Sequence, residues 1–336
     1  MKSITYDKPF KTYEELIQIM QSRNIIIQNK DFAMQVLENM SYYGIINGYK
    51  DSFLQIPGSD LFIPGTRFEE LYTLHIIDTA LNNILFKYIL YLEKALKSRI
   101  SYLVANKYGV YTDYSSSTFL DPKDYLCQNY YSNSSKRRIN TLMRLRGQIS
   151  SVNRNPIMLH YLRSKNHVPP WILTTNISYG LTIEWYNILK SKDREKICST
   201  FISSQVLSKE QVKEFVKKSL EITKEYRNRI AHGNRTFNIS SLPQLPKKQL
   251  LALSFHAVSN KEYNRRMGQN DAFAVILALL IMLNDRYLAT NLRTELFNTF
   301  SPYQNTLFNQ KTIFEVFGFP NDLFIRLDRL IQSKYI

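Results

Sequence analysis

Residues 68–105 read FEELYTLHIIDTALNNILFKYILYLEKALKSRISYLVA, and their apolar side chains recur every three or four positions. This spacing is the period of an amphipathic α-helix, and the run is long enough for one helix or for two helices end to end. Strand signals are sparse in the rest of the chain. The sequence therefore predicts an all-α fold. His75 lies on the apolar face of this run and is interpreted as a core histidine, because no residue with metal-ligand spacing accompanies it.

A second helical pattern covers residues 209–231. Ser208 and Gln211 have the spacing of a capping box, and apolar residues follow at helical intervals. We expect this helix to end near Ala231, with Gly233 as a left-handed C-terminal cap. The end of the helix therefore carries the sequence YRNRIAHG, residues 226–233.

Arg227 and His232, within that sequence, have side chains that could cleave RNA without a metal. A neutral imidazole can take or return a proton near physiological pH, and a guanidinium can stabilise the extra negative charge of a phosphorane. Asn228 would orient the motif or a phosphate by hydrogen bonds. The alternative is structural, because the macrodipole favours a histidine at a helix C-terminus with no chemistry required.

A second match to the Arg-x4-6-His spacing begins at Arg154 and ends at His160. Pro156 lies between these residues, so an uninterrupted helix joining them is disfavoured. One histidine cannot easily act as both acid and base. We therefore expect a second protomer to supply another His232, with His160 as the intramolecular alternative.

The chain is strongly basic, with 44 Lys and Arg against 28 Asp and Glu in 336 residues and a formal charge of +16. A polyanion is therefore the expected partner, with nucleic acid ahead of an anionic membrane surface. No acidic residue occurs between Asp124 and Glu184, and a basic insertion is expected around 125–183. The candidate RNA-binding residues are Lys136, Arg137, Arg138, Arg144, Arg146 and Arg154 in this insertion, with Arg229 and Arg235 beside the motif.

Aromatic residues are interleaved with the cations of the insertion, namely Tyr125, Tyr130, Tyr131, Tyr161 and Trp171. They could stack on RNA bases beside the phosphate contacts. The alternative is a basic, solvated segment whose aromatic residues serve the core.

Other classes of protein have little support in the sequence. Cys127 and Cys198 are the only cysteines and lack metal-ligand spacing, so we expect no disulfide scaffold, no metal site and no cofactor. The first seven residues lack the apolar core of a signal peptide, and the apolar run 272–283 is short for a bilayer span and predicts a buried helix. We therefore expect a cytoplasmic protein without membrane attachment.

The remaining patterns divide the chain into a small helical N-terminal unit, residues 1–66, and a larger helical domain, residues 67–336. Thr12 with Glu15 opens a short helix, and a second helix is expected at 31–40. Glycines among the aromatic residues of 41–49 predict a turn with brief extended structure. Further helices are expected at 135–150, 172–189, 271–288 and 321–332.

Short motifs occur in order over most of the chain. They are KPF (8–10) with TYEE (12–15), SYY (41–43), GY (48–49), GTRF (65–68), EKAL (93–96) with RI (99–100), PW (170–171), SYG (178–180), and RN (227–228) with AH (231–232). Together they resemble the Abi-like family of bacterial phage defence (abortive infection, AbiD/AbiF-type), within the HEPN superfamily of helical proteins.

The resemblance implies an HEPN-like helical bundle and a metal-independent endoribonuclease that acts as an abortive-infection toxin. Arg227, Asn228 and His232 match the Arg-Asn-x-x-x-His motif of such enzymes. The resemblance also implies a homodimer with two motifs at its interface, and restraint by a small noncoding antitoxin RNA. Attack of the ribose 2′-OH would leave a 2′,3′-cyclic phosphate and a 5′-OH. The alternative is a non-catalytic RNA-binding protein of a phage-defence or toxin–antitoxin ribonucleoprotein.

Overall fold

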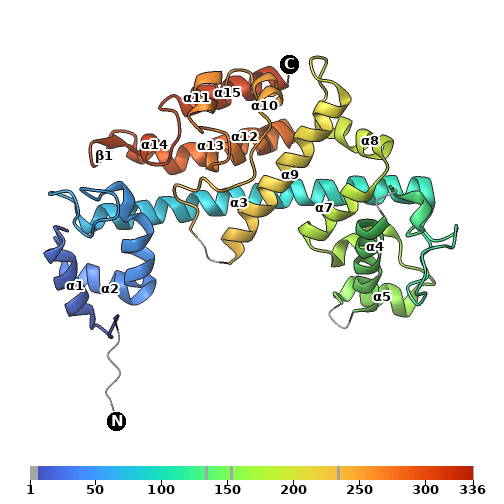
Figure 1. Cartoon of the computed structure of the whole chain (residues 1–336), viewed down its shortest axis with the longest axis horizontal. Helices are drawn as coiled ribbons and strands as arrows, with labels where there is room; N and C mark the ends of the chain where they lie inside the picture. Colours follow the sequence, from blue (N-terminus) through green and yellow to red (C-terminus); the bar gives the residue numbers. More distant parts are fainter. Residues whose placement is uncertain (1–6, 133–134, 152–153, 233–234, 336) are drawn as a thin grey trace, which may run out of the picture. The chain divides into compact units, whose positions relative to one another are not determined.

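The computed structural model describes residues 7–132, 135–151, 154–232 and 235–335, and Figure 1 shows its elements. Two predictions, the character of the first residues and the cap at Gly233, lie outside these ranges. Helices dominate the described residues, and their only sheet is a hairpin of β1 (Leu307–Phe308) and β2 (Lys311–Thr312), paired antiparallel. The predicted all-α fold class is confirmed.

The helices have the following bounds. The α-helices are α1 (Tyr13–Ser22), α2 (Lys30–Met40), α3 (Phe68–Tyr108), α4 (Ser135–Ser150), α5 (Pro156–Ser164), α6 (Pro170–Leu173), α7 (Tyr179–Ile188), α8 (Ser191–Phe201), α9 (Lys209–Ala231), α10 (Lys247–Leu253), α11 (Asn260–Asn264), α12 (Ala272–Met282), α13 (Arg286–Phe300), α14 (Ile313–Val316) and α15 (Leu323–Lys334). The shorter turns are the π-helix η1 (Tyr43–Asn47) and the 3-10 helices η2 (Lys50–Ser52), η3 (Gln128–Tyr130), η4 (Thr174–Asn176) and η5 (Ser301–Tyr303).

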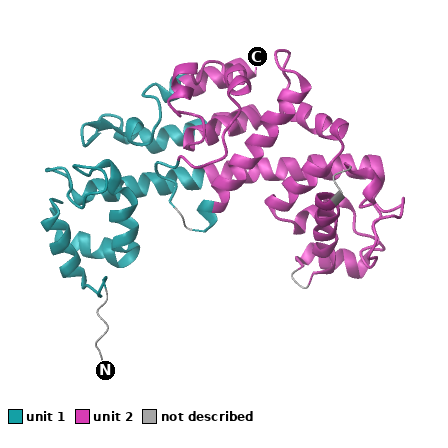
Figure 2. Cartoon of the chain, in the orientation of Figure 1, with its two compact units in different colours: residues 1–84, 229–239, 293–325 teal, residues 85–228, 240–292, 326–336 magenta. Residues whose placement is uncertain are grey.

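The chain forms two compact units, each assembled from segments that are distant in sequence (Figure 2). Unit 1 contains residues 1–84, 229–239 and 293–325, and unit 2 contains residues 85–228, 240–292 and 326–336. Both units therefore need long-range contacts to fold. The predicted boundary at residue 66 stays a prediction.

Unit 1 begins with two helices whose starts follow from their capping residues. The Thr12 side chain accepts from the backbone N–H of Glu15 while the Glu15 carboxylate accepts from that of Thr12, so the predicted capping box of α1 is confirmed. Asn29 caps α2 by accepting from the backbone N–H of Phe32. Both helices turn apolar residues inward, including Met20 and Leu37, so they form one side of the core of this unit.

The prediction of a turn with extended structure at 41–49 is wrong, because this segment is helical and contains the π-helix η1. Gly44 and Gly48 suggested a turn, since glycine weakens a helix. Ile45, Ile46 and Tyr49 are nevertheless buried, and their burial offsets that weak local preference. The segment therefore presents an ordered helical surface to the rest of unit 1.

Unit 2 has its most apolar element in α12, every residue of which is buried, as predicted for this run. The Asp271 side chain caps it by accepting from the backbone N–H of Ala274. The predicted continuation to residue 288 is wrong. Asp285 accepts from the backbone N–H of Leu288 and so caps a new helix, α13, which begins at Arg286.

Three further predictions about helices of the chain have clear outcomes. The run 68–105 is one helix, α3, of 41 residues, and α4 has the predicted bounds. The single helix predicted for 172–189 is wrong, because it divides into α6, η4 and α7. The break falls at Ser178, whose hydroxyl accepts from the backbone N–H of Leu181 and starts α7. A buried tryptophan, Trp185, then anchors α7 by donating to the Tyr131 hydroxyl at 3.2 Å.

Across the described ranges, none of the helices combines the length and the apolar character that crossing a membrane requires.

Candidate nucleic-acid site

The motif residues lie at the C-terminal end of α9, where the sequence predicted them. Ser208 and Gln211 form the predicted capping box, with the side chain of each accepting from the backbone N–H of the other at 3.3 and 3.0 Å. The apolar stripe of α9 is buried, including Phe215 and Leu220, and this fixes the rotation of the helix. Arg227 and Asn228 occupy the last two turns of α9, and the exposed His232 follows its end.

Arg227 is a half-buried cation that no described carboxylate neutralises. Its guanidinium lies 5.9 Å from the centre of the Phe86 ring, and its Nη1 donates to the Asn228 amide oxygen over a long 3.5 Å. A cation held against a ring face keeps its full positive charge. Arg227 therefore offers a charged, partly oriented donor group for an anion.

Arg229 and Arg235 lie around a cavity of about 720 Å³ within unit 1. The walls of this cavity come from η1 and the two residues after it, from residues 75–83 of α3, and from Arg229, Ile230 and Arg235. Arg235 is exposed, and its guanidinium donates to the carbonyl oxygens of Asn47, at 2.9 Å, and Gly48. Arg235 thus ties the chain after the motif to the end of η1, while Arg229 contributes positive charge to the cavity.

A hydrogen-bonded chain of three side chains forms part of the same cavity. The Tyr49 hydroxyl donates to the Asp78 carboxylate at 2.9 Å and lies 3.2 Å from Nδ1 of His75. Burial raises the pKa of the Asp78 carboxyl above its ordinary value, although the hydrogen bonds from Tyr49 and Thr236 oppose this. Burial also raises the pKa of the Tyr49 hydroxyl and lowers that of His75, which favours a neutral imidazole.

His75 is therefore satisfied by a hydrogen bond, in line with its interpretation from sequence, but it is only half-buried and lines the cavity. Sequence reasoning did not place Tyr49, His75 and Asp78 in a common site. One signal was present, because Asp78 follows His75 by three positions, a spacing that places both side chains on one face of α3.

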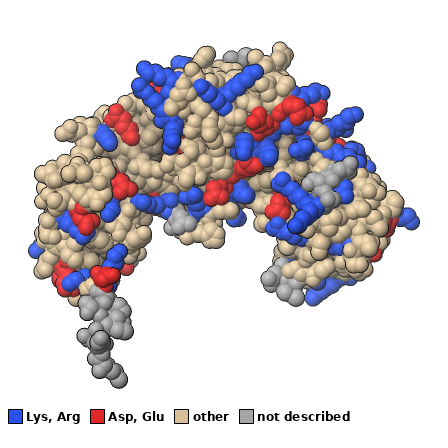
Figure 3. Space-filling view, in the orientation of Figure 1, with Lys and Arg blue, Asp and Glu red and all other residues tan. Residues whose placement is uncertain are grey.

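A basic groove forms on α4 within unit 2. Its volume is about 620 Å³, and it is lined by Lys136, Arg137, Asn140, Thr141, Arg144 and Glu184. Lys136, Arg137 and Arg144 are exposed, and Arg144 forms an ion pair with Glu184. Figure 3 shows Lys and Arg side chains in blue over the part of unit 2 that contains α4. Three of the candidate RNA-binding residues thus share one groove.

The other three candidate residues of the insertion do not line this groove. Arg146 is only 5% exposed and forms an ion pair with Asp124 at 2.7 Å, while its guanidinium stacks 3.8 Å over the Phe119 ring. Arg138 and Arg154 are half-buried and donate to backbone oxygens of Ser132 and Ser150. Arg146 is therefore engaged within the fold, and its burial leaves no surface for RNA.

The aromatic residues of the insertion divide in the same way. Tyr125 and Tyr131 are fully buried, and the Tyr131 hydroxyl donates to the backbone oxygen of Tyr125 at 2.8 Å. These two rings serve the core, as the alternative interpretation held. Tyr130 stacks on Tyr108, and Tyr161 is half-buried. Trp171 is 46% exposed and has the most accessible ring of the five residues.

The earlier arginine–histidine pair is split by a helix start. Asn155 caps α5, whose first residue is Pro156, and Arg154 precedes the helix that contains the exposed His160. The expectation that no uninterrupted helix joins Arg154 to His160 is confirmed.

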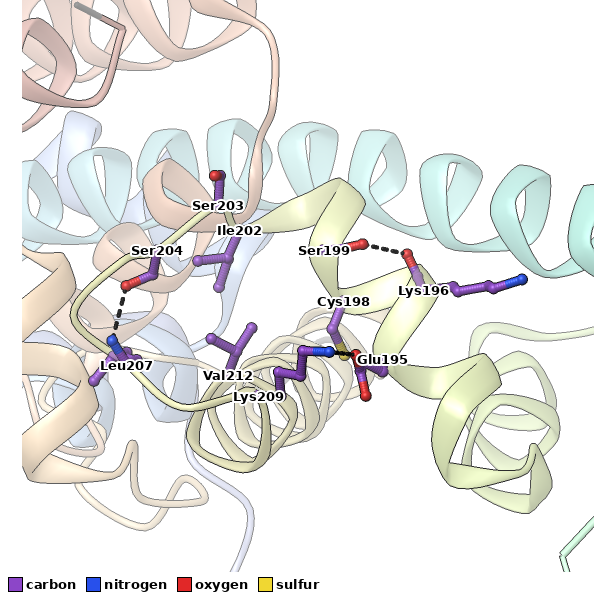
Figure 4. A pocket seen from close by; sticks show the side chains of 10 residues that line it. All are labelled: Glu195, Lys196, Cys198, Ser199, Ile202, Ser203, Ser204, Leu207, Lys209 and Val212. Atoms are coloured by element: carbon purple, nitrogen blue, oxygen red, sulfur yellow. Dashed lines mark hydrogen bonds and ion pairs between the residues drawn. The ribbon is translucent and has the colours of Figure 1, made fainter.

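A smaller cavity of about 290 Å³ lies between α8 and the first turns of α9 (Figure 4). Cys198 lines it, with Sγ 2.9 Å from the Tyr186 hydroxyl. Burial raises the pKa of the Cys198 thiol to about 11, so the thiolate that a nucleophile requires is scarce at neutral pH. No group of three or more His, Cys, Asp and Glu side chains in the described part of the chain is arranged to hold a metal ion.

Neutralising the α4 groove is expected to weaken RNA binding. For the triple variant Lys136→Gln, Arg137→Gln and Arg144→Gln, we expect at least about a tenfold lower affinity and a salt-dependence slope smaller by about 2, since each lost phosphate contact on single-stranded RNA removes about 0.7 from the slope. Fluorescence anisotropy with a labelled single-stranded RNA across a salt series measures both quantities. An equal loss in the exposed-lysine control Lys248→Gln, Lys261→Gln and Lys311→Gln would show that only net charge matters.

The sequence matches the model of a known protein family. The model of a family described as "Abi-like protein" matches residues 35–238, which is more than half of the chain and includes the whole of α9. The searches of curated proteins and of solved structures gave no match.

Proposed function

Since the chain belongs to the Abi-like protein family, we propose that it is an abortive-infection toxin that acts as a metal-independent endoribonuclease. Family membership supports the role in abortive infection. The nuclease activity is the finer part of the proposal and rests on Arg227, Asn228 and His232. The HEPN character of the helical domain, residues 67–336, belongs to the same proposal.

The observation that carries the nuclease proposal is the end of α9. His232 is exposed directly after the last helical residue, and Arg227 is a cation without a carboxylate partner among the described residues. An imidazole in water can exchange protons with a substrate, and an unneutralised guanidinium favours a phosphate that gains charge. A histidine that only satisfied helix carbonyls would need neither solvent exposure nor an unneutralised arginine nearby.

The proposed reaction is an internal transesterification of RNA. The ribose 2′-oxygen attacks the adjacent phosphorus, the bond from phosphorus to the 5′-oxygen breaks, and a 2′,3′-cyclic phosphate and a 5′-OH result. His232 transfers a proton, Arg227 stabilises the phosphorane, and Asn228 orients the motif or a phosphate. Dimerisation, a cytoplasmic location and restraint by a small noncoding RNA complete the proposal.

The proposal is tested by incubating the purified protein, stripped of bound RNA, with end-labelled single-stranded RNA in EDTA. We expect fragments whose 3′ ends carry a 2′,3′-cyclic phosphate, because the reaction uses the substrate's own hydroxyl as nucleophile. Acid treatment, which opens the cyclic phosphate, should shift the fragments on a gel. Loss of cleavage in EDTA, with recovery on adding magnesium, would contradict the metal-independent mechanism.

The second candidate function is RNA binding without catalysis. The α4 groove favours it, because Lys136, Arg137 and Arg144 can bind phosphates with no role in proton transfer. Under this candidate, discrete RNA would copurify with the protein, and the stripped protein would bind RNA and leave it intact.

A further inference from the structure

The cavity of unit 1 contains three kinds of group that recognise a nucleotide. Tyr43, on η1, contributes a ring that is 76% exposed, and aromatic faces stack on bases. The amides of Asn47 and Asn83 line the cavity and can bond base edges. Arg229 adds a guanidinium, the side chain best suited to phosphate. These groups together fit one unpaired nucleotide.

The same cavity fixes the proton of His75. A carboxylate can only accept hydrogen bonds, so the Tyr49 hydroxyl directs its single proton to Asp78. The Tyr49 oxygen must then accept from His75, which places the imidazole proton on Nδ1 and the lone pair on Nε2. No described residue hydrogen-bonds Nε2. A general base requires this tautomer, because Nε2 is free to accept a proton. Two buried groups, the Tyr49 hydroxyl and the Asp78 carboxylate, hold it in place.

The backbone of the cavity supports a functional role. One wall is the π-helix η1, and such turns are rare and are frequent at functional sites. Arg235 and Thr236 secure the opposite wall, through the carbonyls at the end of η1 and through the Asp78 carboxylate at 3.2 Å. Arg235, three positions after His232 in the sequence, is therefore attached to the cavity that contains His75.

We propose that this cavity binds one unpaired ribonucleotide of the RNA and that His75 is the second histidine of the cleavage reaction. His75 Nε2 removes the proton of the 2′-OH, the 2′-oxygen bonds to phosphorus, and the bond to the 5′-oxygen breaks. His232, as the imidazolium, gives its proton to the leaving 5′-oxygen, and water restores both histidines to their starting states. This inference rests on the proposed nuclease function and supplies acid and base within one chain.

The test separates the two histidines by the atom that each one serves. After the cleavage site is mapped on a defined RNA, a second substrate carries sulfur in place of the 5′-oxygen at that site. A thiolate leaves without being protonated, so cleavage of this substrate does not need the acid, His232. It still needs the base, His75, to remove the proton of the 2′-OH. We expect His75→Ala and His232→Ala each to slow cleavage of normal RNA by about 10²- to 10⁴-fold under single-turnover conditions. With the sulfur substrate, the cleavage rate of His232→Ala should return to near that of the parent protein, whereas His75→Ala should remain slow.

Two control variants test whether the effects are specific to the histidines and to the cavity. His256→Asn, in unit 2, replaces an exposed histidine whose φ of 64° suits asparagine, and it should cleave like the parent protein. Tyr43→Ala should weaken binding of a non-cleavable 2′-deoxy analogue about tenfold, consistent with one lost stacking contact. A free nucleoside monophosphate that competes equally well with the analogue would assign the cavity to free nucleotides and overturn an RNA site.

The failures are distinguishable. Cleavage by His75→Ala at the parental rate, with His232→Ala inactive, overturns the inference and leaves the proposed function standing. A parent protein that leaves every RNA intact overturns the proposed function and the role of His75 together. Circular dichroism and the unfolding midpoint of each variant exclude misfolding, and His75→Gln, which retains a polar side chain at Tyr49, should be as slow as His75→Ala.

Discussion

Replacing His232 by alanine is expected to lower the single-turnover rate of RNA cleavage by at least about 10²-fold, in the range of 10² to 10⁴ that a positioned acid or base contributes. RNA affinity should stay within about threefold of the parent value, because an exposed side chain at a helix end makes at most one of many contacts with the polyanion. Single-turnover kinetics at saturating enzyme measure the rate, and anisotropy with a non-cleavable analogue measures the affinity.

Arg227→Lys is the informative companion to His232→Ala. Lysine keeps the charge but loses the planar fork that can bond two phosphate oxygens, so we expect a rate loss smaller than that of Arg227→Ala. If His232→Ala cleaves at the parental rate, His232 is the structural helix-end histidine of the alternative interpretation. A parallel fall in affinity and rate would instead assign His232 to RNA binding.

Replacing Arg146 by alanine is expected to lower the free energy of unfolding by about 3–5 kcal/mol, the usual result of removing one partner of a buried ion pair. Asp124, itself buried, would lose its ion pair at 2.7 Å, and the loop carbonyls of Ser116 and Thr118 would lose their donor. Urea denaturation followed by circular dichroism measures the change.

Arg144→Ala is the matched control, because Arg144 lies two positions earlier on the same helix and is exposed. Its loss should change stability by no more than about 0.5 kcal/mol, as is usual for a surface ion pair, and should weaken RNA binding. Equal stability of the two variants would contradict a structural role for Arg146.

The sequence predicted elements well where a local signal marks their ends. Ser208 with Gln211 gave the start of α9, and the continuous apolar period of 68–105 gave α3. The error at 41–49 fell where burial offsets a weak local preference for helix. Two other errors fell where a single polar side chain, Asp285 or Ser178, caps a new helix within a predicted one. Periodicity alone does not register such a break, because the apolar spacing continues across it.

In the candidate site, too, the residues that are close in sequence could be proposed together, whereas those joined only by tertiary contacts could not. Arg227, Asn228 and His232 could be proposed from the sequence because six consecutive residues at the end of one helix contain all three. The hydrogen bonds of Tyr49 with His75 and Asp78 join the segment after η1 to α3, and no local sequence pattern encodes such tertiary contacts.

Helical geometry could have predicted that Arg144 is exposed and Arg146 is buried. Leu142, Leu145 and Ile149 form the buried stripe of α4, and Arg146 lies four positions after Leu142 on that side, whereas Arg144 does not. Composition identified the basic segment, but the face of the helix decides which of its cations meet solvent.

The two tryptophans give this protein a pair of optical reporters in contrasting surroundings. Trp185 is buried and hydrogen-bonded to Tyr131, so it is shielded from dissolved quenchers as long as unit 2 remains folded. Trp171 is 46% exposed and lies in the stretch of chain that has no acidic residue, where an anionic quencher such as iodide is drawn in by the surrounding charge. Emission that iodide removes therefore comes from Trp171, and the remaining emission reports the integrity of the fold without any added label.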